Sequence, residues 1–194
     1  MKRVMLVVAY DGSNYCGWQI QANGITVQEE LNRCLSKLLK EPIQTAGASR
    51  TDAGVHALGN VAVFDTAARM PAEKISYALN TYLPEDIRIQ YSAEVAADFH
   101  PRYCESEKTY EYRILNRRFP LPTQRLYTYF YHYKLDGEKM REGASFLVGR
   151  HDFASFCGAN AQVKSTVREL TGIDIEKKDD VIPIQVRGRG FLYN

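Results

Sequence analysis

Residues 26–42 read TVQEELNRCLSKLLKEP, and this stretch decides how the first half of the chain folds. It opens with a capping box, Thr26-Val27-Gln28-Glu29, in which the threonine and the glutamate satisfy each other's backbone amides at a helix start. Apolar residues then recur at the spacing of an amphipathic helix: Val27, Leu31, Cys34, Leu35, Leu38 and Leu39. Pro42 lies just past the last of them and cannot continue a helix. The stretch therefore predicts a helix that begins after Thr26 and ends before Pro42.

Outward from this helix, the sequence predicts four strands and a second helix. Apolar and β-branched runs indicate strands at 2–10, 43–48, 60–64 and 87–95. Pro71 is suited to the first turn of a helix that runs to about Tyr82. Residues 49–54 are polar, contain a glycine and indicate a loop. The order β-α-β-β-α-β is that of a split βαβ, or ferredoxin-like, unit.

The second half again predicts a helix among antiparallel strands. Strands are expected at 109–115, 126–133, 167–176 and 181–187, and a helix at 135–148. The last two strands turn at Asp179-Asp180, and Gly149 ends the helix. The join near 96–107 is not rich in glycine or serine, so we expect the halves to pack tightly. The sequence thus predicts an α+β fold with two domains, residues 1–100 and 101–194.

Composition and charge exclude several classes of protein. A chain of 194 residues with 45% hydrophobic and 25% charged residues can bury a core and is not disordered. A net charge of +2 excludes a wholly basic protein, although not a local basic face, and no apolar run approaches a membrane span. The four cysteines form no C-x-x-C pair and the four histidines no H-x-x-x-H pattern. We therefore expect buried thiols in a reducing cytoplasm, with no disulfide framework and no metal site.

The densest polar cluster lies in the loop between two predicted strands, at residues 48–57. Asp52 has Arg50 two residues before it and Gly54 two residues after it. A nearby arginine keeps a carboxylate ionised, and a glycine lets backbone approach a ligand, so Asp52 suits a nucleophile or a base. The alternative is an Asx turn, in which Asp52 only caps backbone amides. His56 has the same two interpretations, as a general acid or base and as a hydrogen-bonded structural residue.

A second cluster is compositional. Residues 101–134 contain seven basic residues against three glutamates, an excess of 7 − 3 = +4, together with seven tyrosines. Basic groups interleaved with aromatic rings on strands are typical of a nucleic-acid surface, where phosphates take the charges and unpaired bases stack. The alternative is a solvated sheet face with half-buried tyrosines. No phosphate-binding glycine motif occurs, so nucleotide-driven chemistry has no support.

Residues 49–57, SRTDAGVHA, resemble the active-site motif of the tRNA pseudouridine synthase A family. The match is long and specific, and the resemblance extends over essentially the whole chain. Four further segments agree with the family in order and spacing: 10–21 (YDGSNYCGWQIQ), 99–102 (FHPR) with 108–114 (KTYEYRI), 151–156 (HDFASF) and 190–194 (GFLYN).

The resemblance implies a fold, a reaction and a site. The fold is two ferredoxin-like halves with antiparallel sheets, packed around a central RNA-binding cleft. The reaction converts uridine to pseudouridine in the anticodon stem-loop of tRNA (positions 38–40), in a cytoplasmic homodimer that needs no cofactor or metal. Asp52 is implied as the nucleophile, Tyr110 as the ring that stacks on the uracil, and Arg50 as the group that displaces the base. The residues implied to bind substrate are Tyr110, Arg50, His56, Arg102, Lys108, Arg117 and Arg118. The resemblance leaves open whether Asp52 attacks the ribose carbon or the base ring.

The sequence departs from the family pattern at Asn60, where a glutamine is usual, and at its end. The family continues past the GFLYN string with a Met-Val-Arg segment and a helix, so we expect a shortened chain with weak activity and weak dimerisation. The main alternative function is a non-catalytic RNA-binding module, which would tolerate the loss of Asp52. A metabolic enzyme on the same fold has no motif in its favour.

Overall fold

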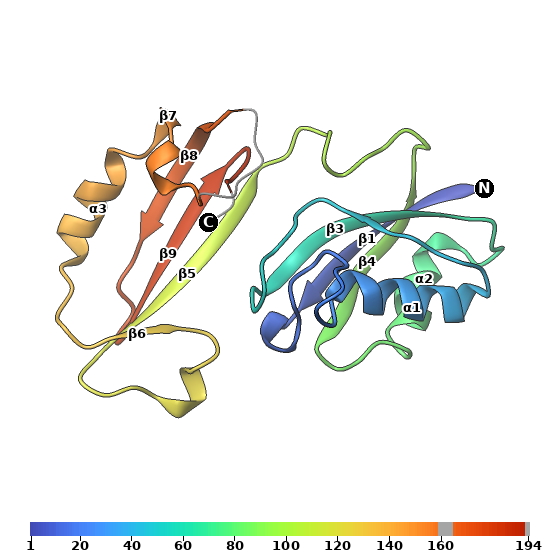
Figure 1. Cartoon of the computed structure of the whole chain (residues 1–194), viewed down its shortest axis with the longest axis horizontal. Helices are drawn as coiled ribbons and strands as arrows, with labels where there is room; N and C mark the ends of the chain where they lie inside the picture. Colours follow the sequence, from blue (N-terminus) through green and yellow to red (C-terminus); the bar gives the residue numbers. More distant parts are fainter. Residues whose placement is uncertain (159–164, 193–194) are drawn as a thin grey trace. The chain divides into compact units, whose positions relative to one another are not determined.

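The computed structural model describes residues 1–158 and 165–192 (Figure 1). The chain forms two compact units, Met1–Cys104 and Glu105–Asn194, so the division falls after Cys104 rather than after residue 100. Each unit carries its own β-sheet with α-helix beside it, and the chain is therefore an α+β protein.

The first unit contains a four-stranded antiparallel sheet. Its strands are β1 (Lys2–Tyr10), β2 (Ala46–Gly47), β3 (Ala57–Thr66) and β4 (Ile87–Val95). They lie in the order β2-β3-β1-β4, so each connection that contains a helix skips over one strand. The expected order of elements, β-α-β-β-α-β, is confirmed, and β1 and β4 have the bounds that the sequence predicts.

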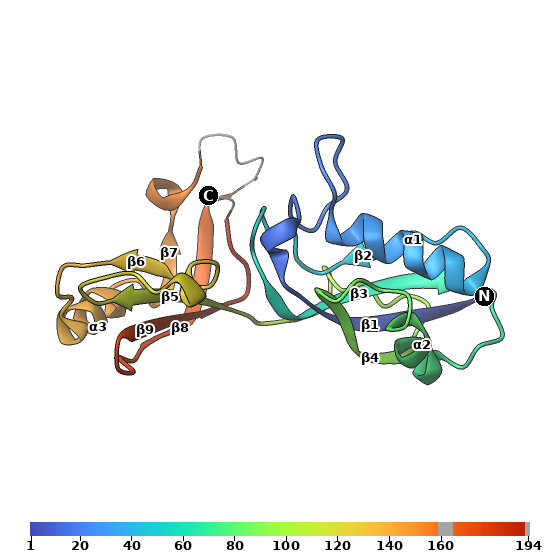
Figure 2. The same cartoon turned by 90° about the horizontal axis from the view of Figure 1, so that it is seen from below.

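Two helices pack on one face of this sheet, α1 (Val27–Leu39) and α2 (Ala72–Leu79) (Figure 2). The predicted start of α1 is confirmed, because Thr26 Oγ1 accepts a hydrogen bond from the Glu29 amide at 3.3 Å. Alternate residues of β1 point toward the helices and are almost completely buried, as a period of two requires. One hydrophobic cluster joins these residues to both helices; it includes Val4, Leu6, Val8, Leu31, Leu35, Ile75 and Leu79.

The strand expected at 43–48 is shorter than predicted, because side chains of α1 take its backbone amides. Ser36 Oγ accepts from the Ile43 amide at 2.9 Å, and Asn32 Oδ1 accepts from the Thr45 amide at 2.9 Å. These amides are therefore withdrawn from the sheet ladder, and only Ala46–Gly47 pairs with β3. The second helix likewise ends at Leu79 rather than near Tyr82, and Asn80 at its end exchanges two hydrogen bonds with the backbone of Ile89.

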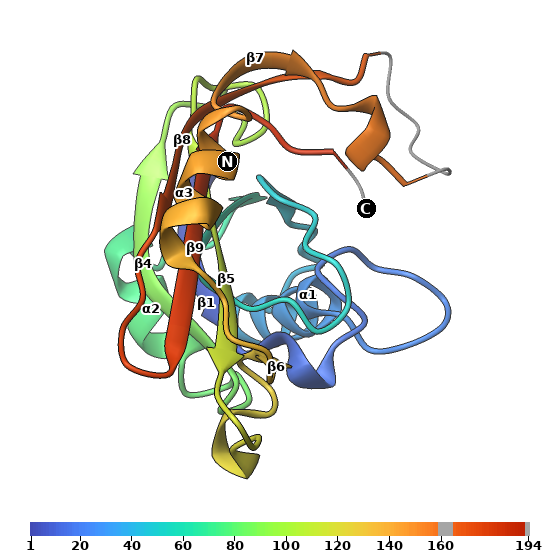
Figure 3. The same ribbon diagram turned by 90° about the vertical axis from the view of Figure 1, so that its left-hand side faces the viewer.

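The second unit contains a five-stranded sheet in the order β6-β5-β9-β8-β7 (Figure 3). The strands are β5 (Lys108–Asn116), β6 (Tyr129–Tyr131), β7 (Gly149–Asp152), β8 (Val167–Ile175) and β9 (Val181–Gly188). The helix α3 (Gly137–Ser145) lies against β8. The expectation of a purely antiparallel sheet is wrong, because β6 pairs with β5 in parallel. The long connection 117–128 makes this possible, since it carries the chain back before β6 begins.

Several finer expectations for the second unit are corrected in length. The strand expected at 126–133 is reduced to Tyr129–Tyr131, and β7 was not expected. The turn at Asp179 is confirmed, with φ of 53° and Lys178 bridged to Val181. The four cysteines form no disulfide with one another, but only Cys34 is buried, so the expectation of buried thiols is wrong for the other three. Among the helices described, none has the length and hydrophobicity that a membrane crossing requires.

Candidate active site

The loop between β2 and β3 carries the polar cluster, and it is pinned where it leaves and re-enters the sheet. The Ala48 amide donates to the Val61 carbonyl at 2.7 Å. Asn60 then holds Ser49 from both sides: its Oδ1 accepts from the Ser49 amide, and its Nδ2 donates to the Ser49 carbonyl, each at 3.1 Å. Asn60 is buried, so these bonds are shielded from water. Asn60 therefore fixes the start of the loop against β3.

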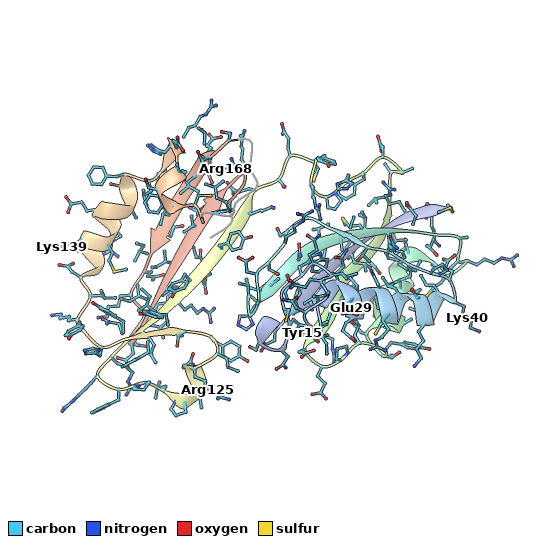
Figure 4. All side chains as sticks on the ribbon, in the orientation of Figure 1. Tyr15, Glu29, Lys40, Arg125, Lys139 and Arg168 are labelled. Atoms are coloured by element: carbon cyan, nitrogen blue, oxygen red, sulfur yellow. The ribbon has the colours of Figure 1, made fainter. Side chains whose placement is uncertain are left out.

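The middle of the loop is braced by the N-terminal segment 10–18. The hydroxyls of Thr51 and Tyr10 are hydrogen-bonded at 2.7 Å in a buried setting, and the Trp18 amide donates to the Thr51 carbonyl at 3.0 Å. The Gly54 amide donates to the Tyr15 carbonyl at 3.3 Å. The Tyr15 hydroxyl is anchored in turn by donating to Asp86 at 2.5 Å, and burial together with this bond raises the pKa of Tyr15. Figure 4 labels Tyr15 in the first unit. Hydrogen bonds therefore hold segment 10–18 and the loop 48–57 together.

Asp52 lies exposed at the tip of this braced loop. The Asx-turn interpretation is wrong, because the turn is closed by the main chain, with the Val55 amide donating to the Asp52 carbonyl at 3.1 Å. Within the described residues, the Asp52 carboxylate forms no hydrogen bond and no ion pair, with Arg50 or any other group. Asp11 provides the contrast, since its Oδ1 does cap the Ser13 amide at 3.0 Å. The loop therefore fixes the backbone of Asp52 and leaves its side chain available for a ligand.

His56 faces the N-terminal segment at the end of the same loop. Its Nδ1 lies 3.1 Å from the Gly12 amide and 3.0 Å from Asp11 Oδ1. A neutral ring accepts from Gly12 through this nitrogen, whereas a ring protonated there donates to Asp11. These contacts agree with a hydrogen-bonded structural residue. That His56 also contacts a substrate stays a prediction.

Two arginines form a cationic spot beside the loop. Arg102 Nε donates to the Gly47 carbonyl at 2.8 Å, which fixes this side chain against the start of the loop. Burial, together with the like charge of Arg50, lowers the pKa of the Arg102 guanidinium below its ordinary value. Within the described residues, neither guanidinium forms an ion pair. The first unit therefore carries Arg50, Asp52 and His56 on one loop, with Arg102 bonded at the start of that loop. The two arginines suit an anion such as a phosphate.

The other site residues expected from the sequence lie in the second unit. Tyr110 is on β5, 36% exposed, with its ring 4.7 Å from that of Phe191 in an edge-to-face arrangement. This contact links two of the family-like segments, although Tyr193 and Asn194 of the last one lie outside the described residues. Lys108 lies at the start of β5, whereas Arg117 and Arg118 follow its end. Arg117 is 3.4 Å from Asp180, and Arg118 lies over the ring of Phe119.

The sequence points to Asp52 as a candidate, but it does not point to the residues that hold the loop of Asp52. Tyr10, Trp18 and Asn60 are internal and do not stand out by charge or motif chemistry. The available signal was the period of two along β1, which places Tyr10 on the buried face at the end of the strand. Nowhere in the described residues do three histidine, cysteine, aspartate or glutamate side chains gather in a group that could hold a metal ion.

Two glycines with positive φ test how tightly the loop is braced. Gly17 (φ 84°) lies so close that a Cβ would sit 2.5 Å from the Thr51 carbonyl oxygen and 3.1 Å from the Asp52 carbonyl carbon. Gly54 (φ 78°) has no atom within 4 Å of such a Cβ. We expect Gly54→Ala to lower the free energy of unfolding by about 1–2 kcal/mol through backbone strain alone. Gly17→Ala adds a clash and is expected to cost a further ~1–3 kcal/mol.

Urea unfolding of the two variants, followed by circular dichroism, measures this difference. Gly54→Ala is the matched control, because it introduces the same methyl group at a nearly identical φ. Equal losses in the two variants would mean that the Thr51 carbonyl moves aside at no cost, and that Gly17 does not brace the loop.

A family model described as tRNA pseudouridine synthase matches residues 6–104 and 144–194. The tRNA pseudouridine synthase A of Thermoanaerobacter sp. (strain X514) is 47% identical over 194 residues, which cover all of this chain and 80% of that protein. The protein of that name from Acetivibrio thermocellus is 45% identical with the same coverage. The tRNA pseudouridine synthase A 2 of Clostridium tetani is 46% identical, over 79% of its length.

Proposed function

The chain belongs to the tRNA pseudouridine synthase family, and we propose that it isomerises uridine to pseudouridine in the anticodon stem-loop of tRNA, at positions 38–40, with Asp52 as the nucleophile. The observation that carries the assignment of Asp52 is its exposed carboxylate, without a partner in the described residues, on a loop held by buried hydrogen bonds. If the side chain only stabilised the loop, we would expect its carboxylate oxygens to accept hydrogen bonds from backbone amides, as Asp11 Oδ1 does.

The reaction exchanges one bond of the nucleoside for another. The bond from the ribose C1′ to the base N1 breaks, a bond from C1′ to C5 forms, the hydrogen at C5 leaves as a proton, and N1 gains a proton. The atoms balance and no electrons are gained or lost, so the Asp52 carboxylate needs only to form and release a covalent bond. This proposal for Asp52 holds whether the carboxylate attacks the ribose carbon or the base ring.

The uridine must leave its stack before this carboxylate can reach it, which costs a few kcal/mol. We propose that Tyr110 stacks on the extruded uracil, because its ring is partly exposed and is held by an edge-to-face contact with Phe191. Stacking on an aromatic ring contributes about 1–3 kcal/mol per base, enough to offset much of the cost. Arg50 is proposed to displace the base or to occupy the space that it leaves.

The remaining substrate contacts are proposed to be ionic. Arg102 and Arg50 are close enough to repel each other, so an RNA phosphate between them would relieve the repulsion. Lys108, Arg117 and Arg118 are proposed to contact phosphates along the second unit. Because Lys108 and Arg117 lie at opposite ends of β5, these contacts span roughly 30 Å of strand, which suits an extended RNA rather than a small molecule.

The finer architecture and assembly follow from the same proposal. We propose that the two units are ferredoxin-like halves around a central RNA-binding cleft, and that the protein acts as a cytoplasmic homodimer without a cofactor. The strand order β2-β3-β1-β4 of the first unit supports the ferredoxin-like assignment for that half.

Mapping of pseudouridine in a tRNA transcript tests the proposed position. After incubation with the chain, chemical modification of pseudouridine followed by primer extension is expected to give stops at positions 38–40 and nowhere else. A transcript with cytidine at these positions is the control and is expected to give none. Stops at other uridines would overturn the assignment of the anticodon stem-loop while leaving the isomerase assignment in place.

A further inference from the structure

The unexpected parallel pairing of β5 and β6 gathers three segments at one end of the second sheet. Parallel strands end on the same side, so the residues after Asn116 and those after Tyr131 emerge together. The turn before β9 joins them, because β9 runs antiparallel to β5 and begins opposite Leu115. Figure 1 shows β6 and the adjoining ends of β5 and β9 at the lower edge of this unit. Residues far apart in the sequence therefore meet at this end.

These segments line an open pocket of about 340 Å³. It is lined by Asn116, Arg117, Arg118, His132, Lys134 and Lys177. Asn116 is buried and ties the segments together: its Nδ2 donates to the carbonyls of Tyr131 and Tyr133 at 2.9 and 2.7 Å, and its Oδ1 accepts from the Leu135 amide at 3.1 Å. The Asn116 amide donates to the Asp180 carbonyl at 2.7 Å. The pocket is thus a built feature of the fold.

Four of the six lining residues are cationic, and their charges are poorly compensated. Arg117 has Asp180 at 3.4 Å. For Arg118, Lys134 and Lys177, the described part of the chain offers no carboxylate within ion-pair distance. The nearby Glu176 is paired instead with Lys178, at 3.0 Å. Converging cations repel one another, so an anion of matching size would be bound favourably here.

Two aromatic rings contact residues that line this pocket, and they indicate which kind of anion it suits. Arg118 lies over the ring of Phe119 at 5.0 Å, and the ring of His132 is 3.9 Å from that of Tyr133. Phe119 and Tyr133 are both more than 60% exposed. Cations beside exposed rings are suited to RNA, because the cations bind backbone phosphates and the rings stack on bases. A small inorganic anion would interact with the cations but would not stack on the rings.

We propose that this pocket binds backbone phosphates of the RNA substrate, as a contact separate from the Asp52 loop and from the base that stacks on Tyr110. The inference rests on the proposed function, because it takes the RNA to be the tRNA substrate. Tyr110 and Arg117 are seven residues apart on an extended strand, or roughly 23 Å, so the pocket holds RNA several nucleotides from the reacting uridine.

Lys177 and Lys178 provide a matched pair for the test. They are neighbours in one turn, and replacing either by glutamine removes one positive charge from the same region. Only Lys177 lines the pocket, whereas Lys178 is held by Glu176. Binding of labelled tRNA transcript to the chain is measured by fluorescence anisotropy at several salt concentrations. We expect Lys177→Gln to weaken binding about 3- to 10-fold and to reduce the slope of log K against log salt by about 1. Lys178→Gln is expected to stay within about twofold.

Each outcome of this experiment decides the inference. Further weakening by Lys134→Gln in combination with Lys177→Gln supports a shared phosphate site. Equal binding by the Lys177 and Lys178 variants, in a chain that binds tRNA, would overturn the pocket assignment and leave the proposed function untouched. No binding of tRNA by the unsubstituted chain would count against both.

Discussion

Asp52→Asn is expected to abolish pseudouridine formation, with a loss of at least about 10³-fold in turnover, while tRNA binding stays within about twofold. Asparagine keeps the size of the side chain but is a far weaker nucleophile than a carboxylate. Because the Asp52 side chain makes no hydrogen bond in the described structure, the substitution removes no contact that holds the loop. Turnover is measured as pseudouridine formed per enzyme, and binding by anisotropy with the same transcript.

Asp98→Asn is the matched control for this prediction. Asp98 is also an exposed aspartate of the first unit, but it lies outside the braced loop. We expect this variant to keep full turnover. An Asp52→Asn protein with normal turnover would remove the nucleophile from the account, and the 49–57 loop would then be an RNA-binding structure only.

Tyr110→Ala is expected to weaken the productive complex about 5- to 150-fold, since it removes a stacking contribution of about 1–3 kcal/mol. Tyr110→Phe keeps the ring and its edge contact with Phe191, so it is expected to retain tRNA affinity and to lose only what the hydroxyl contributes to turnover. The two variants are compared by single-turnover kinetics over a range of enzyme concentrations, which separates binding from the chemical step.

Tyr91→Ala is the control for the loss of a ring. Tyr91 is a strand tyrosine on β4 with 54% of its surface exposed, and we expect its replacement to leave both parameters unchanged. Identical activity of Tyr110→Ala and Tyr110→Phe would mean that the hydroxyl matters rather than the ring, and it would contradict the stacking role.

Much of the first unit was predictable because its signals are local. The strand Lys2–Tyr10 alternates between the two faces of the sheet, and the start of α1 at Thr26 follows from a capping box. The shortened strand at 43–48 was not predictable in this way. It depends on Asn32 and Ser36 of α1 reaching the backbone of Thr45 and Ile43, and such tertiary bonds leave no periodic trace in the sequence.

The second unit was harder to predict because its pairing is not local. Tyrosine-rich residues 126–133 favour a strand by propensity, but only Tyr129–Tyr131 pairs, and it pairs in parallel across the connection 117–128. Without this pairing, Arg118, Lys134 and Lys177 have no reason to converge. Composition alone therefore indicates a basic, aromatic segment. Only the strand pairing shows that Arg118, Lys134 and Lys177 line one pocket.

The candidate site divides in the same way. Asp52 and Arg50 stand out as candidates in the sequence, because they are charged residues in the polar cluster at 48–57. The sequence does not predict the hydrogen bonds that Tyr10, Trp18 and Asn60 make to the loop. Buried residues of these types occur in many structural settings, so their presence alone does not indicate such bonds.

Release of tritium from tRNA transcripts labelled at uridine C5 tests the central claim most directly, because the C5 hydrogen must leave when the glycosidic bond is exchanged. The assay compares the 194-residue chain with its Asp52→Ala variant. We expect release that disappears with Asp52→Ala. If the unsubstituted chain releases no tritium although it binds tRNA, the isomerase account is contradicted and the protein is an RNA-binding module.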